Sequence, residues 1–311
     1  MDVHLRDLRY FVAIAEHLHI TRAAEALYVS QPTLSKQLRA LEGQLRVRLF
    51  ERDRRGVTLT PAGAALLPHA RAVLDAWTEA EQALAAAAER ERTTLVVGIS
   101  TGLGRGLLPA VRARLAESAP HATLQVRQVG WGDPAAGLDA SGADRTDAAF
   151  VWLPLPGDGE RYAQVEIVRE PSLIALPAGH PLAGRTDLDI SDVLDEPFLA
   201  LPAAAGALRD FWLVTRARDG VPARIGAEIA NTDETAEALL AGLGVCLLSA
   251  GNAPNVARPG IAIRPITGVE PSRLALAWRR DDRRPLLRAL REAVQAAVSG
   301  ATSRSGRPPA R

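Results

Sequence analysis

The stretch His19–Leu45, HITRAAEALYVSQPTLSKQLRALEGQL, decides how the start of this chain folds. Thr21 can cap a short helix whose alanine-rich inner face would let a second helix cross it closely. Ser30 can cap that second helix, with Pro32 in its first turn, where a missing N–H group costs nothing. The segment therefore predicts two crossing helices joined by a tight turn.

The second of these helices has a polar face that suits DNA. Leu34, Leu38 and Leu41 lie four and three residues apart, so they share one face and must point to a core. The opposite face can hydrogen bond to base edges in the major groove, and its cations also suit phosphates. An ordinary helical hairpin with a solvated polar face is the alternative, but the combined features favour a recognition helix. The outward residues are Gln31, Thr33, Ser35, Lys36 and Arg39.

A small basic hairpin is predicted directly afterwards, at Val47–Thr60, VRLFERDRRGVTLT. An apolar pair precedes a basic turn, and Val57 and Leu59 then alternate with polar residues as in a strand. A basic turn is usually solvated surface, but after a helix-turn-helix it is well placed to contact the DNA backbone or minor groove. The predicted DNA-binding residues are Thr21, Ser30, Gln31, Pro32, Thr33, Ser35, Lys36, Arg39, Arg52, Arg54 and Arg55.

A long helix is expected from about Pro61 to Arg90, where apolar residues recur at alternating steps of three and four. Such a seam is typical of helices that pair between subunits. A single amphipathic helix packed on its own domain would show the same spacing, so the spacing alone leaves both possibilities open. The DNA-binding head before the helix favours a dimerising linker. The predicted dimerisation residues are Leu67, Leu74, Trp77 and Leu84.

The composition indicates a soluble protein with at least two cores, since 47% of the 311 residues are hydrophobic and 23% are charged. The net charge is only +1, but residues 1–60 carry ten basic against seven acidic side chains, a mild lean towards phosphate. Cys246 is the only cysteine, which excludes an internal disulfide and a multi-cysteine metal site. We find no signal peptide and no apolar run of membrane length, and so expect a cytoplasmic protein without membrane contact.

After Thr93 the texture changes to short apolar runs separated by helical stretches. This alternation predicts βα units and parallel sheets. The tail from Ser299 is rich in Ser, Gly, Pro and Arg, which predicts disorder. The expected strands are Leu95–Ile99, Leu124–Val129, Ala148–Leu153, Leu173–Leu176 and Val245–Leu248.

About 60 residues at the start resemble the LysR-type family of transcriptional regulators, through the segments Leu5–Val12, Ser30–Ser35, Leu49–Arg52 and Leu59–Gly63. Weaker likeness extends to about residue 295. The resemblance implies an α/β protein with a mainly α winged helix-turn-helix, a linker helix that pairs subunits, and an effector domain of two Rossmann-like lobes resembling periplasmic solute-binding proteins. It also implies a homodimer or homotetramer on double-stranded DNA of dyad symmetry, and we add RNA polymerase as an expected partner.

The expected domain boundaries follow from this resemblance. The winged helix-turn-helix takes residues 1–60 and the linker helix residues 61–91. The effector domain takes residues 92–298, with lobe I at about 92–161 and 264–298 and lobe II at about 162–263. Two chain crossings would make the cleft between the lobes the binding site. Residues 299–311 form the disordered tail.

The first predicted strand runs into hydroxyl and glycine residues ahead of a helix. Ser100, Thr101 and the following backbone N–H groups can cradle an anion, so we expect a small organic effector, a carboxylate, and no cofactor. A dinucleotide site on Gly102, Gly104 and Gly106 is the enzymatic alternative, but its glycine spacing is wrong and the next strand ends without an acidic residue.

Analogy with the family supplies the rest of the expected effector site. Thr232 and Asp233 also lie in a predicted helix cap with Asn231, and capping alone is the alternative role for these residues. The tryptophans could equally be packing residues. The expected effector-binding residues are Ser100, Thr101, Gly102, Gly130, Trp131, Trp152, Leu201, Pro202, Thr232 and Asp233.

No catalytic set and no metal site is predicted. His17 and His19 diverge on a helix, and the remaining histidines are scattered. Cys246 lies among apolar residues and is interpreted as a core residue, since a redox switch would want a second, resolving cysteine. We therefore expect a ligand-responsive transcription factor and no enzyme. A binding protein or enzyme built on the two-lobed fold alone would leave residues 1–60 unexplained.

Overall fold

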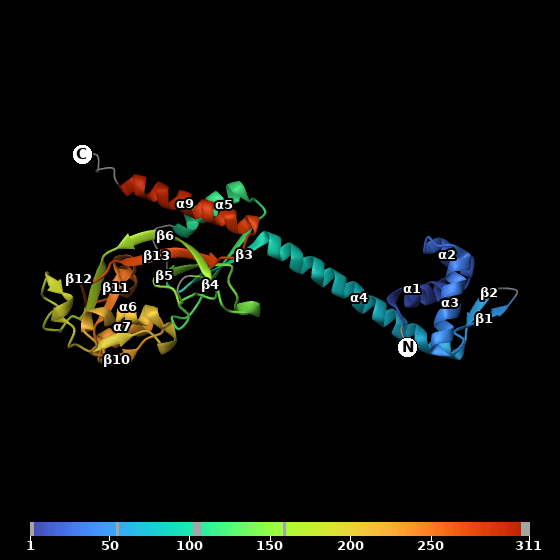
Figure 1. Cartoon of the computed structure of the whole chain (residues 1–311), viewed down its shortest axis with the longest axis horizontal. Helices are drawn as coiled ribbons and strands as arrows, with labels where there is room; N and C mark the ends of the chain where they lie inside the picture. The colour runs from blue at the N-terminus through green and yellow to red at the C-terminus, as the bar shows by residue number, and fades with distance from the viewer. Residues whose placement is uncertain (1–2, 54–55, 102–106, 158–159, 306–311) are drawn as a thin grey trace. The chain divides into compact units, whose positions relative to one another are not determined.

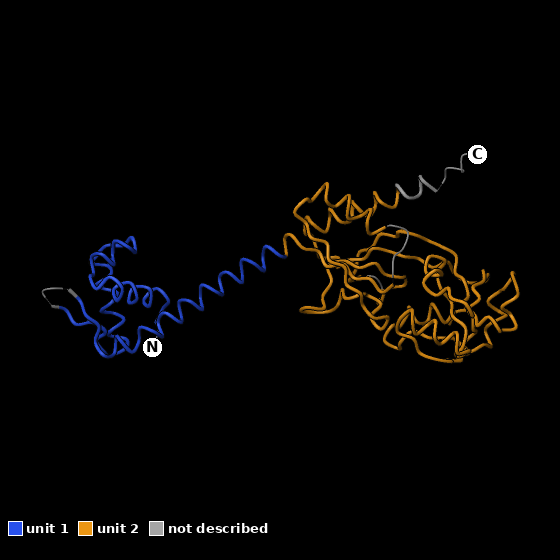
Figure 2. The backbone as a smooth tube through the Cα atoms, turned by 180° about the vertical axis from the view of Figure 1, so that it is seen from behind, with its two compact units in different colours: residues 1–90 blue, residues 91–311 orange. Residues whose placement is uncertain are grey.

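The computed structural model describes residues 3–53, 56–101, 107–157 and 160–305. The chain divides into two compact units, Met1–Arg90 and Glu91–Arg311, which Figure 2 colours separately. Among the described helices, none combines the length and the apolar character needed to cross a lipid bilayer.

The first unit consists of three short helices, a β-hairpin and most of a long helix (Figure 1). Its core includes Phe11, Ile14, Leu34 and Leu38, each no more than 1% exposed. The two strands pair antiparallel, which confirms the predicted wing. The elements are α1 (Leu5–His17), α2 (Ile20–Ala26), α3 (Gln31–Leu45), β1 (Phe50–Asp53), β2 (Gly56–Leu59) and α4 (Pro61–Thr93).

The two predicted helix caps have different outcomes. Ser30 caps α3 as predicted, because its Oγ accepts a hydrogen bond from the backbone N–H of Thr33 at 3.3 Å. The predicted cap at Thr21 is wrong, since α2 begins at Ile20 and His19 occupies the cap position. Leu18 ends α1 in a left-handed conformation, so a single extended residue separates the helices and Thr21 falls inside the first turn.

The start of α4 is fixed by a cap and a close backbone approach. The Thr60 Oγ1 accepts a hydrogen bond from the N–H of Gly63 at 3.0 Å and donates one to the carbonyl of Arg48 at 2.7 Å. A Cβ at Gly63 would lie 2.2 Å from the carbonyl oxygen of Leu49, so only glycine fits there. These contacts lock the wing strands against the long helix.

The second unit begins with a five-stranded sheet in the order β4-β3-β5-β13-β6, which we call lobe I. β3 pairs in parallel with β4 and β5, as predicted. β13 runs antiparallel to β5 and β6, so the prediction of parallel pairing is wrong for these two strand pairs. Helices α5 and α9 lie together along this sheet (Figure 1) and share its apolar core. The elements are β3 (Thr94–Ile99), α5 (Leu107–Ser118), β4 (Thr123–Gln128), β5 (Ala148–Trp152), β6 (Tyr162–Glu170), β13 (Ser272–Arg279) and α9 (Pro285–Ser305).

Lobe II, inserted between β6 and β13, holds a four-stranded sheet in the order β11-β7-β12-β8 and a two-stranded parallel sheet of β9 and β10. In the larger sheet, β7 runs antiparallel to both of its neighbours, which again departs from the predicted parallel pairing. The elements are β7 (Ser172–Pro177), β8 (Leu188–Asp189), β9 (Phe198–Ala200), α6 (Ala207–Trp212), β10 (Ile225–Glu228), α7 (Thr232–Leu240), β11 (Cys246–Ser249), α8 (Ala253–Val256) and β12 (Ile261–Thr267).

The crossings between the lobes lie later in the chain than predicted. We expected them near Tyr162 and Arg264, but β6 pairs with β13 along its whole length and keeps the chain in lobe I as far as Glu170. β12 likewise pairs with β7 and β8 and stays in lobe II as far as Thr267. The strand pairing therefore places the crossings at 170–172 and 267–272.

The predicted disorder from Ser299 is wrong as far as Ser305, because α9 continues to that residue. Leu287, Leu290 and Val294 are at most 1% exposed and anchor the helix on lobe I. A helix that is anchored by packing extends at little further cost, which overrides the polar composition of its last turns. Residues 306–311 lie outside the described part of the chain.

Candidate functional site

The surface of α3 offers polar side chains as predicted. Leu34, Leu38 and Leu41 are at most 1% exposed and hold the helix against α1 and α2. The face away from this core can therefore approach a partner without disturbing the fold. Its exposed residues are Gln31, Pro32, Thr33, Lys36 and Arg39.

Ser35 does not project from this surface, and its prediction as an outward residue is wrong. It is only 3% exposed, because it lies one position after Leu34 and one turn after Gln31, on the shoulder of the buried face. Its Oγ accepts a hydrogen bond from the side-chain amide of Gln31 at 3.1 Å. Ser35 can thus orient Gln31 but cannot itself reach a base.

The remaining head residues predicted to meet DNA lie outside α3. Thr21 is exposed on the first turn of α2, and Arg52 is exposed on β1. Arg54 and Arg55 lie outside the described residues, so the predicted basic wing tip stays a prediction. The side chain of Thr33 makes a 2.7 Å hydrogen bond with Ser30, which keeps the first turn of α3 compact.

Tyr28 was missed by the sequence reasoning. It occupies the turn between α2 and α3, two residues before Ser30, the residue that caps α3, and it is 97% exposed. Its φ of +55° is a left-handed conformation that a bulky side chain adopts at a cost. In the sequence, Tyr28 fits the apolar repeat of neither α2 nor α3. An aromatic residue outside both repeats could have been recognised as exposed.

The seam predicted on α4 divides into two parts. Leu67 and Leu74 are partly buried and pack against the core of the first unit, so here the alternative of a helix packed on its own domain applies. Trp77 is 42% exposed and Leu84 is 68% exposed. Only these two of the four predicted dimerisation residues present apolar surface for a second helix.

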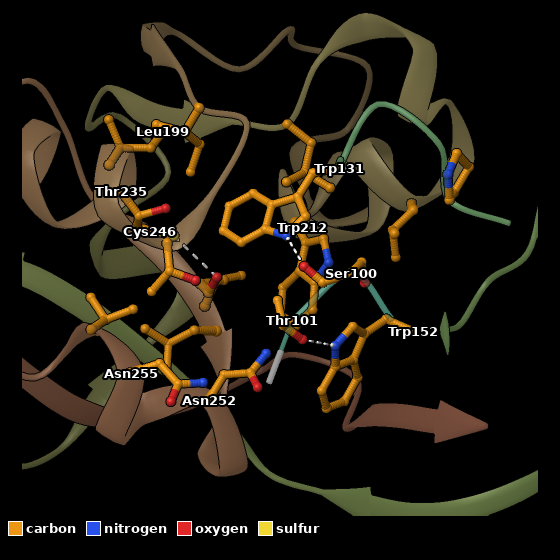
Figure 3. A pocket seen from close by; sticks show the side chains of 18 of the residues that line it. Ser100, Thr101, Trp131, Trp152, Leu199, Trp212, Thr235, Cys246, Asn252 and Asn255 are labelled. Atoms are coloured by element: carbon orange, nitrogen blue, oxygen red, sulfur yellow. Dashed lines mark hydrogen bonds between the residues drawn. The ribbon is translucent and has the colours of Figure 1, made fainter. Parts of the chain in front are cut away.

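A cavity between the two lobes holds most of the predicted effector residues (Figure 3). Its empty volume is about 780 Å³, part of which is open to solvent. Walls come from the ends of β3 and β5 in lobe I and from α6, α7, β11 and α8 in lobe II. The predicted residues that line it are Ser100, Thr101, Trp131, Trp152, Leu201 and Thr232.

Three other predicted residues do not belong to the described lining. Asp233 is exposed and pairs with Arg258 at 2.6 Å, which suits a surface role at the start of α7. Gly130 and Pro202 lie beside lining residues but outside the lining itself. Gly102 lies outside the described residues, as do the glycines of the rejected dinucleotide alternative. Asn231 caps α7 by accepting from the N–H of Glu234 at 2.9 Å, so the expected cap is confirmed.

The indole groups of lobe I are tied to the first turn after β3. The Trp131 Nε1–H donates to the carbonyl of Ser100 at 2.8 Å, and the Trp152 Nε1–H donates to the Thr101 Oγ1 at 3.3 Å (Figure 3). Each donor is thereby satisfied, and each ring is held in one orientation. The two predicted hydroxyl residues therefore also position the two predicted tryptophans.

The lobe II wall contains residues that the sequence reasoning missed. Trp212 stacks edge-on against Trp152 with ring centroids 6.3 Å apart. Asn252 and Asn255 contribute amide groups that face the same cavity (Figure 3). Trp212 is the last residue of α6, Asn252 caps α8 and Asn255 lies within α8. Periodicity did not predict these two short helices, so the convergence of the three side chains on the pocket had no local signal.

The charge of the pocket does not favour the expected carboxylate. Among its described lining residues none is cationic, and one, Asp133, is acidic. Its two carboxylate oxygens accept hydrogen bonds from the N–H groups of Ala135 and Gly137 at 2.9 and 2.8 Å. No group of His, Cys, Asp or Glu in the described chain could hold a metal ion.

Cys246 also lines this pocket, and it is 8% exposed. Burial raises the pKa of its thiol to about 12. The thiolate is the nucleophilic form of cysteine, so almost none of the reactive form exists at neutral pH.

A winged helix-turn-helix joined to a two-lobed α/β domain with a pocket between its lobes defines a class of ligand-responsive DNA-binding regulators. Residues 5–64 match the model of the bacterial regulatory helix-turn-helix of the lysR family, and residues 88–299 match the LysR substrate binding domain. The chain belongs to the LysR family of bacterial transcriptional regulators. Members of this family bind DNA, respond to small molecules and form oligomers.

Individual relatives of the chain carry different names. The chain is 38% identical to a probable hydrogen peroxide-inducible genes activator of Mycobacterium avium, over 80% of this chain and 79% of that one. It is 31% identical to the Hca operon transcriptional activator HcaR of Escherichia coli, over 97% and 100%. A solved structure of a cysteine mutant of Corynebacterium glutamicum OxyR matches 100% of this chain and 99% of that chain, with 31% identity and a TM-score of 0.58.

Proposed function

We propose that this regulator senses a small organic molecule in the pocket between lobes I and II and transmits its presence to DNA bound by α3. One observation carries the proposal: residues from both lobes line a single cavity, with Ser100, Thr101 and Trp152 on one side and Trp212 and Thr232 on the other. A ligand that touches both walls favours one relative setting of the lobes, which is a population shift that requires unequal affinity for the two settings.

The DNA-reading part of the proposal assigns separate roles within the head. Gln31, Thr33 and Lys36 read base edges, because they are exposed on α3 and carry donors and acceptors. Ser35 positions Gln31. Arg39, Arg52, Thr21 and Tyr28 contact the sugar-phosphate backbone, which fixes register but carries no sequence information. The phenol of Tyr28 suits a phosphate oxygen, and its exposure leaves it no other partner among the described side chains.

The oligomer is proposed to form through the second half of α4. Every residue from Asp75 to Arg90 is exposed, so the apolar side chains in this half of the helix are left uncovered. Pairing would bury Trp77 and Leu84 against a second copy. A homodimer or homotetramer in the cytoplasm, which contacts RNA polymerase from a DNA site of dyad symmetry, completes the proposed function.

Hydrogen peroxide is a second candidate effector, favoured by the names of several relatives. HcaR matches with 31% identity over 97% of this chain, so overall similarity does not decide between peroxide and another molecule. Cys246 is the only cysteine, so no disulfide can form within one chain. The raised thiol pKa, about 12, also disfavours oxidation. Peroxide treatment followed by intact-mass measurement should leave Cys246 unmodified, and a rapid gain of one oxygen atom would reinstate this candidate.

The proposed function is tested by separating DNA binding from the ligand response. We would measure anisotropy of a labelled duplex from the chain's own upstream region, and screen small molecules with a reporter driven by that region. Leu201→Trp fills the pocket and should keep DNA binding while abolishing the response. Val221→Trp is the matched control, because Val221 is 66% exposed and outside the pocket lining. If both variants respond like the parent, the pocket is not the effector site.

A further inference from the structure

We propose that the pocket between the lobes takes a neutral, planar aromatic molecule that carries a hydrogen-bonding group. The inference rests on the proposed function, since it names the chemical class of effector for that same site. It replaces the carboxylate that Ser100 and Thr101 led us to expect.

The first observation is the concentration of aromatic surface. The chain has only five tryptophans in 311 residues. Three of them, Trp131, Trp152 and Trp212, line this one cavity. A sensor for an aliphatic molecule needs no such gathering, whereas a flat ring gains from stacked and edge-on contact with indoles beyond the area that it buries.

The second observation is that these rings are held in place before a ligand arrives. Hydrogen bonds fix Trp131 to Ser100 and Trp152 to Thr101. Trp212 meets Trp152 at an interplanar angle of 73° and Phe211 at 81°, both edge-on. Binding a flat ring therefore orders few side chains, which favours affinity. Fixed rings also favour a flat shape over a bulky one.

The third observation is charge. The described lining of the pocket offers no cation to neutralise a carboxylate, and a buried carboxylate without a counter-charge is costly. Asp133 would add repulsion to that cost. A ligand cation fares little better, because both oxygens of Asp133 already accept backbone hydrogen bonds that shape the turn at Ala135 and Gly137. The pocket thus favours a molecule without net charge.

The fourth observation gives the ligand its polar end. Asn252 and Asn255 lie three residues apart and both line the pocket (Figure 3). Each amide has donors and an acceptor, and within the described part of the chain neither side chain is engaged in a hydrogen bond. An amide, a phenol or a carbonyl on the ring would satisfy them.

Four probes of nearly the same shape separate the effects of ligand charge and ligand aromaticity on binding to the full-length protein. Benzamide is neutral and planar, benzoate is its anion, benzamidine is its cation and cyclohexanecarboxamide is its saturated analogue. Isothermal titration and tryptophan fluorescence should show benzamide binding at least tenfold more tightly than each of the other three. Preference for benzoate, benzamidine or the saturated amide, or no binding of benzamide at 20 mM, would overturn the inference.

Variants tie the preference to the pocket. Trp212→Leu keeps an apolar wall but removes the ring, so it should lower benzamide affinity at least fivefold and reduce its advantage over cyclohexanecarboxamide. Asn252→Leu should lower benzamide affinity but leave toluene affinity unchanged. Val221→Leu is the control, because Val221 is 66% exposed and lies outside the pocket lining. Unchanged preferences in Trp212→Leu would overturn the assignment.

The same preparations distinguish this inference from the proposed function. If benzamide shows the expected preferences but Leu201→Trp still responds in the reporter screen, the ligand chemistry stands and the effector role of the pocket fails. If Leu201→Trp loses the response while benzoate binds more tightly than benzamide, the effector role stands and the neutral aromatic class is wrong.

Discussion

The recognition helix and the effector pocket are built in opposite ways. All the side chains that α3 offers to DNA come from Gln31 to Arg39, one run of sequence whose buried and exposed faces follow the helical repeat. The pocket gathers residues from Ser100 to Val256 and from both lobes. The head is thus specified by local contacts, whereas the pocket depends on how distant segments meet.

Helix α4 contains the same contrast within one element. Leu67 and Leu74 complete the local core of the first unit, while Trp77 and Leu84 wait for a partner that the single chain does not supply. Apolar residues recur at steps of three and four in both halves of α4, so their spacing does not distinguish the two halves. What an apolar stripe covers can be learned only from its neighbours.

The largest expected effect is a loss of dimer stability after a substitution in the second half of α4. Leu84→Glu would place an unpaired charge in the proposed helix pair and should weaken the dimer by at least about 3 kcal/mol. Sedimentation analysis should show monomers with an unchanged thermal transition of the head. Leu74→Glu is the comparison, since it should destabilise the head itself. A native mass for Leu84→Glu would place the dimer contact elsewhere.

A smaller effect is expected where the head closes on itself. Gly63→Ala should lower the free energy of unfolding of the head by about 2 to 3 kcal/mol, because its Cβ would overlap the carbonyl of Leu49 and force the backbone to shift. Gly43→Ala is the matched control within α3, where nothing lies within 4 Å of the added Cβ. That change should raise stability by up to about 1 kcal/mol. Equal effects in chemical denaturation would contradict the close approach.

These residues show where prediction from sequence succeeds. The cap at Ser30, the buried Leu34 and the strands of the wing rest on neighbours within a few positions, so propensity and periodicity found them. β13 was missed because its role depends on pairing with β5 and β6, which lie more than a hundred residues earlier in the chain. Trp212 and Asn255 were missed for the same reason, since no local pattern indicates which wall a side chain will join.

The reading of bases by α3 is tested by Gln31→Ala. Loss of the amide should weaken binding to the specific site by about 2 kcal/mol and leave binding to shuffled DNA nearly unchanged, because base contacts carry the sequence information. Arg39→Gln is the comparison, because Arg39 is assigned to the sugar-phosphate backbone; this change should also weaken binding to shuffled DNA and reduce the salt dependence. Equal losses of Gln31→Ala on both duplexes would remove Gln31 from the reading set.

Ser35 sharpens the distinction between a residue that reads and one that positions. Ser35→Ala removes the acceptor for the Gln31 amide and should cost about 1 kcal/mol at the specific site, through a looser Gln31. In the Gln31→Ala background the same change should cost nothing at that site, because there is no amide left to orient. Additive losses in this double-mutant cycle would mean that Ser35 acts on its own.

The smallest expected effect is on ligand affinity in the pocket, where Thr101 has two roles. Its Oγ1 accepts the Trp152 indole N–H at 3.3 Å, and its side chain lines the cavity. Thr101→Val keeps the shape but leaves that indole donor without its acceptor, so benzamide affinity should fall by about 1 kcal/mol as the ring loses its fixed orientation. Basal DNA binding should not change, because α3 is folded by local contacts alone.

Thr101→Ser is the control: it retains the hydroxyl and should restore most of the affinity for benzamide. If Thr101→Val binds benzamide as tightly as the parent, the indole is oriented by packing against Trp212, and the hydroxyl at this position serves only the turn after β3.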